Sequence, residues 1–210
     1  KSYPSYKDSG VEWIGEIPSG WFVTNVKYLL KKDGFRSGPF GSSLITNQLA
    51  EYGNYVVYTP EHLTEKHIEY QLYVPLERED ELKKYVIKDG DIVLPIVGTL
   101  GRGKLFTSHS RRGILNQRLC RISPDTDKVN SQYLLNFLTI TNVVKVQFDL
   151  EKKGSILDHI TKEIIFNLQL PFSPLPEQQQ IVSFLDHKTQ KIDELIEKTK
   201  KKIELLKEKR

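Results

Sequence analysis

The chain has 210 residues, 38% of them apolar and 28% charged, and its 31 basic and 27 acidic side chains give a formal net charge of +4. No stretch approaches the roughly 20 apolar residues of a membrane-spanning helix and no signal-peptide pattern opens the chain, so we expect a cytoplasmic protein without a membrane partner. Its one cysteine, Cys120, excludes an internal disulfide framework and a zinc site built from several thiolates.

Residues 1–21 form an N-terminal segment that is rich in Gly, Pro and Trp and shows little periodicity, so the first elements are predicted after it. A short amphipathic stretch covers 22–32, and the glycines and proline of 36–43 predict a loop without regular structure. Residues 55–58 are β-branched or aromatic, which predicts a strand closed by Pro60.

Further short strands are predicted in the middle of the chain. The apolar run 92–97 follows a turn signal, and Pro95 inside it favours an edge or bulged strand because proline cannot donate a ladder hydrogen bond. After the glycine-rich loop 98–103, strands are predicted at 105–106 and within 114–122. This spacing of strands and glycine turns favours a curled sheet or partial barrel.

Helices are predicted in the last third of the chain. One covers 131–138, with Asn130 or the serine after it as cap, and a weaker one covers about 161–166. The fold class is therefore α+β: a mainly β domain with a few flanking helices over 1–173, followed by one long C-terminal coiled-coil helix over 174–210.

In that long helix, apolar and threonine side chains recur at alternating steps of three and four residues, which is the a/d pattern of a coiled coil. A helix so polar on its other faces cannot bury this seam alone, so we expect it to lie against another helix. We predict the following contacts with a dimer or partner helix: Val182, Leu185, Ile192, Ile196, Ile203 and Leu206. Thr189 and Thr199 in the same seam weaken a simple dimeric zipper.

Basic residues are concentrated where acidic ones are missing. No acidic residue lies between Asp91 and Asp125, while the stretch contains Arg102, Lys104, Arg111, Arg112, Arg118 and Arg121. Such a local field attracts a polyanion even when the whole molecule is nearly neutral. A solvated basic face explains the same pattern equally well.

Catalytic and metal-binding patterns are incomplete. Gly98–Lys104 has the spacing of a phosphate-binding P-loop, but Leu105 stands where a magnesium-binding hydroxyl is needed and no helical periodicity follows. His62 and His67 are five residues apart, so they would not share one helix face as a metal-binding pair does. We predict no catalytic centre and no metal site.

Several stretches, in order along the chain, resemble motifs of one family. They are Tyr6–Pro18 closed by Trp21, Ser37–Leu44, Gly90–Val93 with Gly98–Gly101, Leu115–Arg118, and Pro174–Asp186. The family is the specificity (S) subunit of type I restriction–modification enzymes. The resemblance implies a subunit without chemistry of its own, which reads one half of a bipartite DNA target as a target recognition domain and docks methyltransferase (M) subunits.

The resemblance also implies where the cofactors and further partners belong. Restriction (R) subunits join some of these assemblies, and S-adenosylmethionine, ATP and Mg²⁺ are expected on the partner subunits, with no cofactor in this chain. A full-length subunit holds two recognition domains and two spacer helices that pair antiparallel. This chain resembles one half, either a natural half-subunit or a fragment, and the half-subunit form predicts a homodimer through the C-terminal helix.

A DNA surface needs cations for the phosphates and polar side chains for the base edges. The predicted DNA-binding residues are Arg36, Ser37, Arg102, Lys104, Arg111, Arg112, Asn116 and Gln117. Turn stabilisation or packing explains Asn116 and Gln117 equally well, and Lys152, Lys153 and Ser155 form a weaker second loop. The alternative function is a coiled-coil dimerising protein-interaction adaptor without DNA binding, and an independent enzyme would rest on the incomplete P-loop alone.

Overall fold

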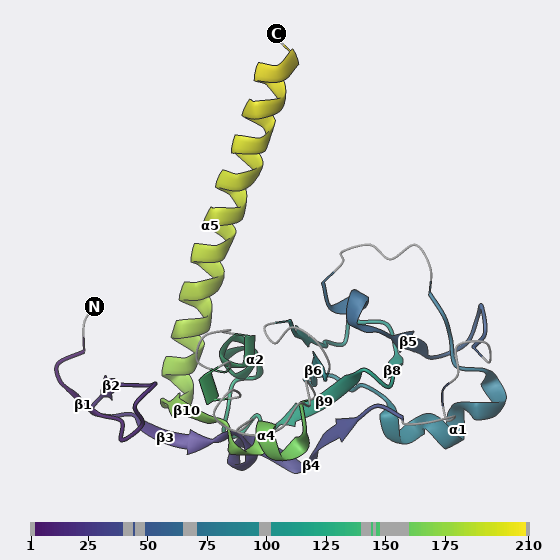
Figure 1. Ribbon diagram of the computed structural model, residues 1–210, viewed down its shortest axis with the longest axis horizontal. Helices are drawn as coiled ribbons and strands as arrows, with labels where there is room; N and C mark the ends of the chain where they lie inside the picture. Colours follow the sequence, from purple (N-terminus) through teal and green to yellow (C-terminus); the bar gives the residue numbers. More distant parts are fainter. Residues whose placement is uncertain are drawn as a thin grey trace.

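The computed structural model describes residues 3–39, 44, 49–64, 71–96, 102–139, 144, 146–147 and 160–208. The chain forms a broad head from which one long helix, α5 (Leu175–Glu208), rises at one side (Figure 1). At 1.5 Å per residue this 34-residue helix is about 50 Å long. The α+β class and the long C-terminal helix are confirmed.

The head is built from short strands, short helices and 3₁₀ turns. The strands are β1 (Tyr6–Asp8), β2 (Glu16–Pro18), β3 (Phe22–Asn25), β4 (Leu30–Ser37), β5 (Val56–Tyr58), β6 (Ile92–Pro95), β7 (Lys104–Leu105), β8 (Gly113–Leu115), β9 (Leu119–Pro124) and β10 (Gln169–Phe172). The other helices are α1 (Glu79–Leu82), α2 (Ser131–Thr139) and α4 (Lys162–Asn167), and the 3₁₀ turns are η1 (Val26–Leu29), η4 (Pro60–Leu63), η5 (Leu76–Arg78) and η6 (Lys83–Tyr85).

A four-stranded antiparallel sheet in the order β4-β9-β6-β7 is the centre of the head. Since side chains alternate between the faces of a strand, Ile92 and Val93 of β6 face opposite sides. Within the described residues, three further two-stranded sheets are β1–β2, β3–β10 and the parallel pair β5–β8. The strands are thus divided among small sheets, and the expected single curled sheet or partial barrel is not what forms.

Apolar side chains cover both faces of the central sheet. On one face lies the proximal core, in which Ile92 and Leu94 of β6 pack with Leu134 of α2, Ile165 of α4 and Val182 of α5. The other face carries the distal core, made of Val56, Tyr58, Ile87, Val93, Phe106, Leu115 and Leu119. The sheet therefore separates the part of the head that holds the long helix from the part built around β5 and β8.

Two local expectations are wrong, for reasons of strand pairing. Arg36 and Ser37 are not in a loop but end strand β4, where they pair with Arg121 and Cys120 of β9. Strand β6, which contains Pro95, is an inner strand rather than an edge strand. The proline is tolerated because β7 pairs only with Ile92 and Val93, so Pro95 has a neighbouring strand on one side alone.

The remaining element predictions agree with the structure. The predicted strands at 55–58, 105–106 and 114–122 correspond to β5, β7 and the pair β8 and β9. Helices α2 and α4 form where expected, the first capped by Asn130, whose side-chain oxygen accepts from the backbone N–H of Tyr133 at 3.0 Å. The amphipathic stretch 22–32 becomes β3, η1 and the start of β4.

The base of α5 is tied into the head. The buried side chain of Gln178 accepts from the backbone N–H of Asn130 and donates to the carbonyl of Ser173, both at 2.8 Å. Glu177 accepts from the indole of Trp21 at 3.0 Å and from the hydroxyl of Tyr3. The division into 1–173 and 174–210 remains a prediction, since the first two turns of the helix are packed with the head.

Candidate nucleic-acid interface

The predicted DNA-binding residues fall in three parts of the head. The first part, at the end of β4 and in the turn between β8 and β9, holds Arg36, Ser37, Asn116 and Gln117. The second, at β7, holds Arg102 and Lys104, and the third, just before β8, holds Arg111 and Arg112.

The end of β4 and the β8–β9 turn are in direct contact. The backbone N–H of Gly38 donates to the carbonyl of Leu119 at 2.8 Å, and a Cβ atom at position 38 would lie 1.8 Å from the carbonyl oxygen of Asn116. Only glycine permits this approach of the two backbones. The contact brings Ser37 next to Asn116 and Gln117, which are far apart in the sequence.

The side chain of Asn116 stabilises its own turn. Its oxygen accepts from the backbone N–H of Arg118 at 2.9 Å, which is the local bond that Asn commonly makes in turns. The alternative prediction for Asn116, that its side chain stabilises a turn, is therefore supported. Gln117 and Arg118 are exposed and form the polar outer surface of this turn.

Arg36 and Lys104 lie on the same face of the central sheet, at its opposite edges. Arg36 pairs with Arg121, and Val93 pairs with both Arg121 and Lys104, so the four residues form one row across the strands. Lys104 is exposed, with its ammonium 5.8 Å from the centre of the Phe106 ring. Val93 and Arg121, between them, are buried, so the two cations are at separate edges of the sheet and not on one continuous exposed surface.

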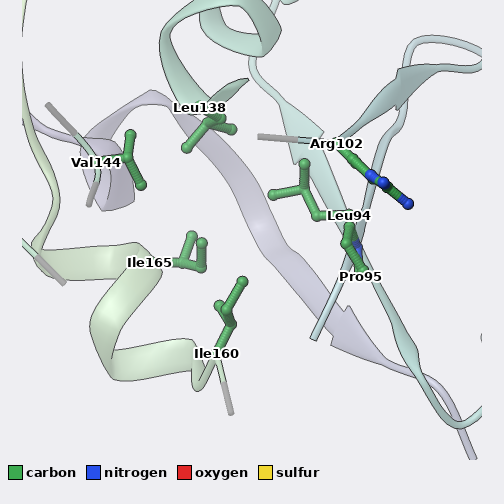
Figure 2. A pocket seen from close by; sticks show the side chains of 7 residues that line it. All are labelled: Leu94, Pro95, Arg102, Leu138, Val144, Ile160 and Ile165. Atoms are coloured by element: carbon green, nitrogen blue, oxygen red, sulfur yellow. The ribbon is translucent and has the colours of Figure 1, made fainter. Parts of the chain in front are cut away.

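Arg102 is the polar residue at the edge of a small apolar pocket. Figure 2 shows its guanidinium directed away from the pocket, which Leu94, Leu138, Ile160 and Ile165 also line. Its exposure leaves it accessible to a ligand from outside the head.

Arg111 and Arg112 are exposed beside the parallel strands β5 and β8. Arg111 donates to the side-chain oxygen of Gln71 at 2.6 Å, and the guanidinium of Arg112 lies 5.8 Å from the ring centre of Tyr55. These contacts orient the two side chains without neutralising them, because neither partner is a carboxylate.

Arg121 does not contribute to the basic surface, because it is buried and forms an ion pair. Only 9% of the residue is exposed, and its guanidinium lies 3.5 Å from the carboxylate of Asp91 while donating to the carbonyl of Val86 at 2.6 Å. Asp91 also accepts from the backbone N–H of Lys88 and from the hydroxyl of Ser123. By contrast, no ion pair within the described residues involves the eight predicted DNA-binding residues.

A basic groove beside β4 was not predicted. A hollow of about 540 Å³ lies between the β4 edge and α4, and the cations that line it are Lys27, Lys31, Arg36 and Lys162, with Asp33 as its one acidic residue. We call these five residues and the space between them the basic groove. The ammonium of Lys162 lies 5.0 Å from the ring centre of Phe166, which also lines the hollow.

A bulge in β4 shapes this groove. The pairing of β4 with β9 shifts register between Leu30 and Phe35, and Asp33 adopts a left-handed backbone with φ of 56°. Gly34 packs so tightly that a Cβ atom there would lie 2.9 Å from the carbonyl oxygen of Ser123. The lysines of 22–32 were visible in the sequence, but their proximity to Lys162 depends on how α4 packs.

In the described part of the chain, no three His, Cys, Asp or Glu side chains are grouped as metal ligands. Residues 98–101 of the P-loop-like stretch lie outside the described residues, as do Lys152, Lys153 and Ser155, and Lys104 begins a strand rather than a helix. Among the described helices, none combines the length and the apolar character that crossing a membrane requires.

The predicted seam of α5 is exposed except at its base. The exposed fractions are 38% for Leu185, 56% for Ile192, 46% for Ile196, 48% for Ile203 and 58% for Leu206. Val182 is a correction: it is 5% exposed and belongs to the proximal core, so its packing is provided by its own head.

Comparison with known proteins places this arrangement in a family. Residues 38–205, most of the chain, match the family described as the type I restriction modification DNA specificity domain. The chain belongs to this family. Most of the exposed polar residues described above, from Gly38 onward, lie within the matched specificity domain.

Individual relatives agree in sequence and in fold. The type I restriction enzyme MjaVIII specificity subunit of Methanocaldococcus jannaschii is 31% identical over 141 residues, which are 62% of this chain and 32% of that protein. A chain of a type I R-M system, from work on its complex assembly and conformational transition, superposes with a TM-score of 0.64 at 18% identity, over 90% of this chain and 42% of that one. The HsdS subunit from Thermoanaerobacter tengcongensis gives 0.61 at 20% identity, over 90% of this chain and 41% of that one. The specificity domain thus spans less than half the length of these relatives.

Proposed function

We propose that this specificity domain reads one half of a bipartite DNA target and has no chemistry of its own. The observation that carries the proposal is the contact between Gly38 and Asn116, which brings Ser37 close to Gln117 and Arg118. These polar residues lie together in a chain that belongs to the DNA specificity family. Hydroxyl, amide and guanidinium groups are the side chains that read base edges in a groove.

The cations of the head would hold the DNA backbone. Arg36 lines the basic groove and Lys104 is exposed at β7. Arg111 and Arg112 lie beside β8 and form no ion pair with another described residue. Phosphate contacts of this kind supply most of the affinity and fix the orientation of the protein. Arg102 and Lys104 would supply further phosphate contacts at the opposite edge of the sheet.

We further propose that α5 serves as the spacer on which the complex assembles. Its exposed seam fits a second helix, and as half of a two-domain subunit the chain would pair with another copy and dock methyltransferase subunits, with restriction subunits joining some assemblies. S-adenosylmethionine, ATP and Mg²⁺ would then belong to those partners. Two identical heads would read an interrupted palindrome.

Selection from a random duplex library tests the DNA proposal. Protein with the methyltransferase partner should enrich a gapped motif, and Gln117→Ala should relax preference at one position of each half-site. Lys104→Gln should instead weaken binding to all sequences and reduce the salt slope by about 0.9 for one lost phosphate contact. The control is Lys191→Gln, an exposed charge on α5 away from the head. Absence of any enriched motif, with and without the partner, would contradict DNA reading.

The exposed seam also favours the second candidate, a coiled-coil adaptor that binds protein only. This function predicts stable self-association together with no measurable DNA binding. Because both candidates predict self-association, the duplex selection is the measurement that separates them.

A further inference from the structure

The 3₁₀ turn η4 holds an exposed carboxylate close to the polar turn that joins β8 to β9. The backbone N–H of Asn116 donates to the carbonyl of Tyr58 at 3.0 Å, so the end of β8 lies against the end of β5. Glu61 comes three residues after Tyr58 and is exposed. Arg118, two residues after Asn116, is exposed as well. A carboxylate and a guanidinium from distant parts of the sequence therefore share one region of the surface.

The charges of Glu61 and Arg118 act on each other. A hydrogen bond from the Thr59 hydroxyl, another from the backbone N–H of Glu61 and the positive charge of Arg118 lower the pKa of the Glu61 carboxyl. The carboxylate is therefore ionised at neutral pH and can only accept hydrogen bonds. Within the described residues, no ion pair joins the two side chains, so both keep hydrogen-bonding capacity for a ligand.

Turn η4 is anchored to the distal core. The backbone N–H of Thr59 donates to Nδ1 of His62, and the backbone N–H of His62 donates to the carbonyl of Thr59, both at 3.1 Å. The buried ring of His62 packs edge-on against Tyr58 of the distal core, with ring centres 5.3 Å apart. This support holds Glu61 on a fixed backbone, as a side chain that recognises a ligand requires.

A carboxylate does not suit a surface that only grips phosphates. The ammonium of Lys104 donates to the carbonyl of His62 at 3.4 Å, so a second cation lies against the same turn. Negative charge among these cations repels the DNA backbone and weakens binding to every sequence. Glu61 is favourable on DNA only where it meets a donor, and the major groove offers the amino groups of cytosine and adenine.

A G·C base pair matches the two side chains together. Guanine presents the acceptors N7 and O6, which suit the guanidinium of Arg118, and its partner cytosine presents an amino donor beside them, which suits Glu61. An A·T pair has a donor in place of O6 and an acceptor in place of the cytosine amino group. Both side chains would then be mismatched.

We propose that Glu61 and Arg118 together read one G·C base pair in the major groove of the half-site. Arg118 donates to the guanine and Glu61 accepts from the cytosine. The inference rests on the proposed DNA reading and adds two specificity-determining residues and the base pair that they select. Neither residue was among the predicted DNA-binding residues.

Duplex selection with the methyltransferase partner present tests this pair. We expect the wild-type motif to contain a G·C pair whose preference over A·T falls about fivefold or more in Glu61→Gln, with the rest of the motif unchanged. Arg118→Ala should lose preference at the same base pair. The control is Glu77→Gln, an exposed carboxylate in the 3₁₀ turn η5, which should leave the motif intact.

A guanine analogue that lacks the N7 acceptor gives a second measurement. In filter-binding titrations, this base at the selected position should weaken binding by the wild-type protein and by Glu61→Gln, because both retain Arg118. Binding by Arg118→Ala should not respond to the analogue. Since both altered side chains are exposed, the variants should unfold at the wild-type temperature, and a changed motif then reports a lost contact.

Each result has a defined meaning. An unchanged motif in Glu61→Gln, or loss of preference at different base pairs in the two variants, would overturn the inference while leaving DNA reading intact. Uniformly tighter binding of Glu61→Gln to all sequences would do the same, because the carboxylate would then face the backbone. A wild-type selection that enriches no motif would overturn the proposed function itself.

Discussion

The buried pair of Arg121 and Asp91 offers the sharpest test of how the head is held together. Lys88 donates to one carboxylate oxygen of Asp91 and Ser123 donates to the other, so Asp91→Asn keeps only one of these two acceptors. The same change leaves the guanidinium of Arg121, 9% exposed, without its carboxylate. Removing one partner of a buried ion pair destabilises proteins by about 3–5 kcal/mol. For a chain of this size, that loss lowers Tm by roughly 6–20 °C.

Thermal unfolding followed by circular dichroism measures this change. The double variant Asp91→Asn/Arg121→Met should recover most of the loss, because replacing both charges by neutral groups removes the unpaired charge. The control is Arg118→Ala, an exposed arginine whose loss should change stability by less than about 0.5 kcal/mol. If Asp91→Asn were as mild as this control, or the double variant no better than the single one, the ion pair would not be the stabilising contact inferred here.

Three further changes probe the DNA surface and the base of α5. In the basic groove, Lys162→Gln should reduce the salt slope of DNA binding by about 0.9 for a lost phosphate contact, and an unchanged slope in filter-binding titrations would exclude the groove. Gly38→Ala should destabilise by roughly 1–3 kcal/mol in urea unfolding, because its Cβ would lie 1.8 Å from a carbonyl oxygen, whereas Gly20→Ala, with nothing within 4 Å, should be neutral. The hydrogen bond to Glu177 and partial burial raise the pKa of Tyr3 from 10.0 to about 12, so its stabilisation is present below pH 10 and is lost as pH rises toward 12. An ultraviolet titration in which Tyr3→Phe removes no late-ionising phenol would refute that assignment.

Local sequence patterns were sufficient for most of the elements. The cap of α2 at Asn130, the β-branched run of β5 and the heptad pattern of α5 each act through residues close in sequence. The sequence could not show which strands become neighbours. Pro95 suggested an edge because proline lacks an N–H, but the short partner strand β7 ends before reaching it.

The candidate interface was harder to predict, because a charge alone does not reveal its partner. Arg121 belonged to the acid-free stretch, yet the carboxylate of Asp91 just before that stretch neutralises it across two adjacent strands. Lys162 joins the basic groove only through the packing of α4. Ser37 and Gln117 were both predicted, but only the close approach at Gly38 shows that they share one surface.

The central sheet has a consequence for how such a protein can acquire new targets. The sheet formed by β4, β9, β6 and β7 lies between the distal core and the proximal core, which packs against the base of α5. The β8–β9 turn and the strands β5 and β8 can accordingly be exchanged, as a graft, without repacking the layer that anchors the helix. For the function proposed above, base preference and the packing that anchors α5 would then be able to change independently.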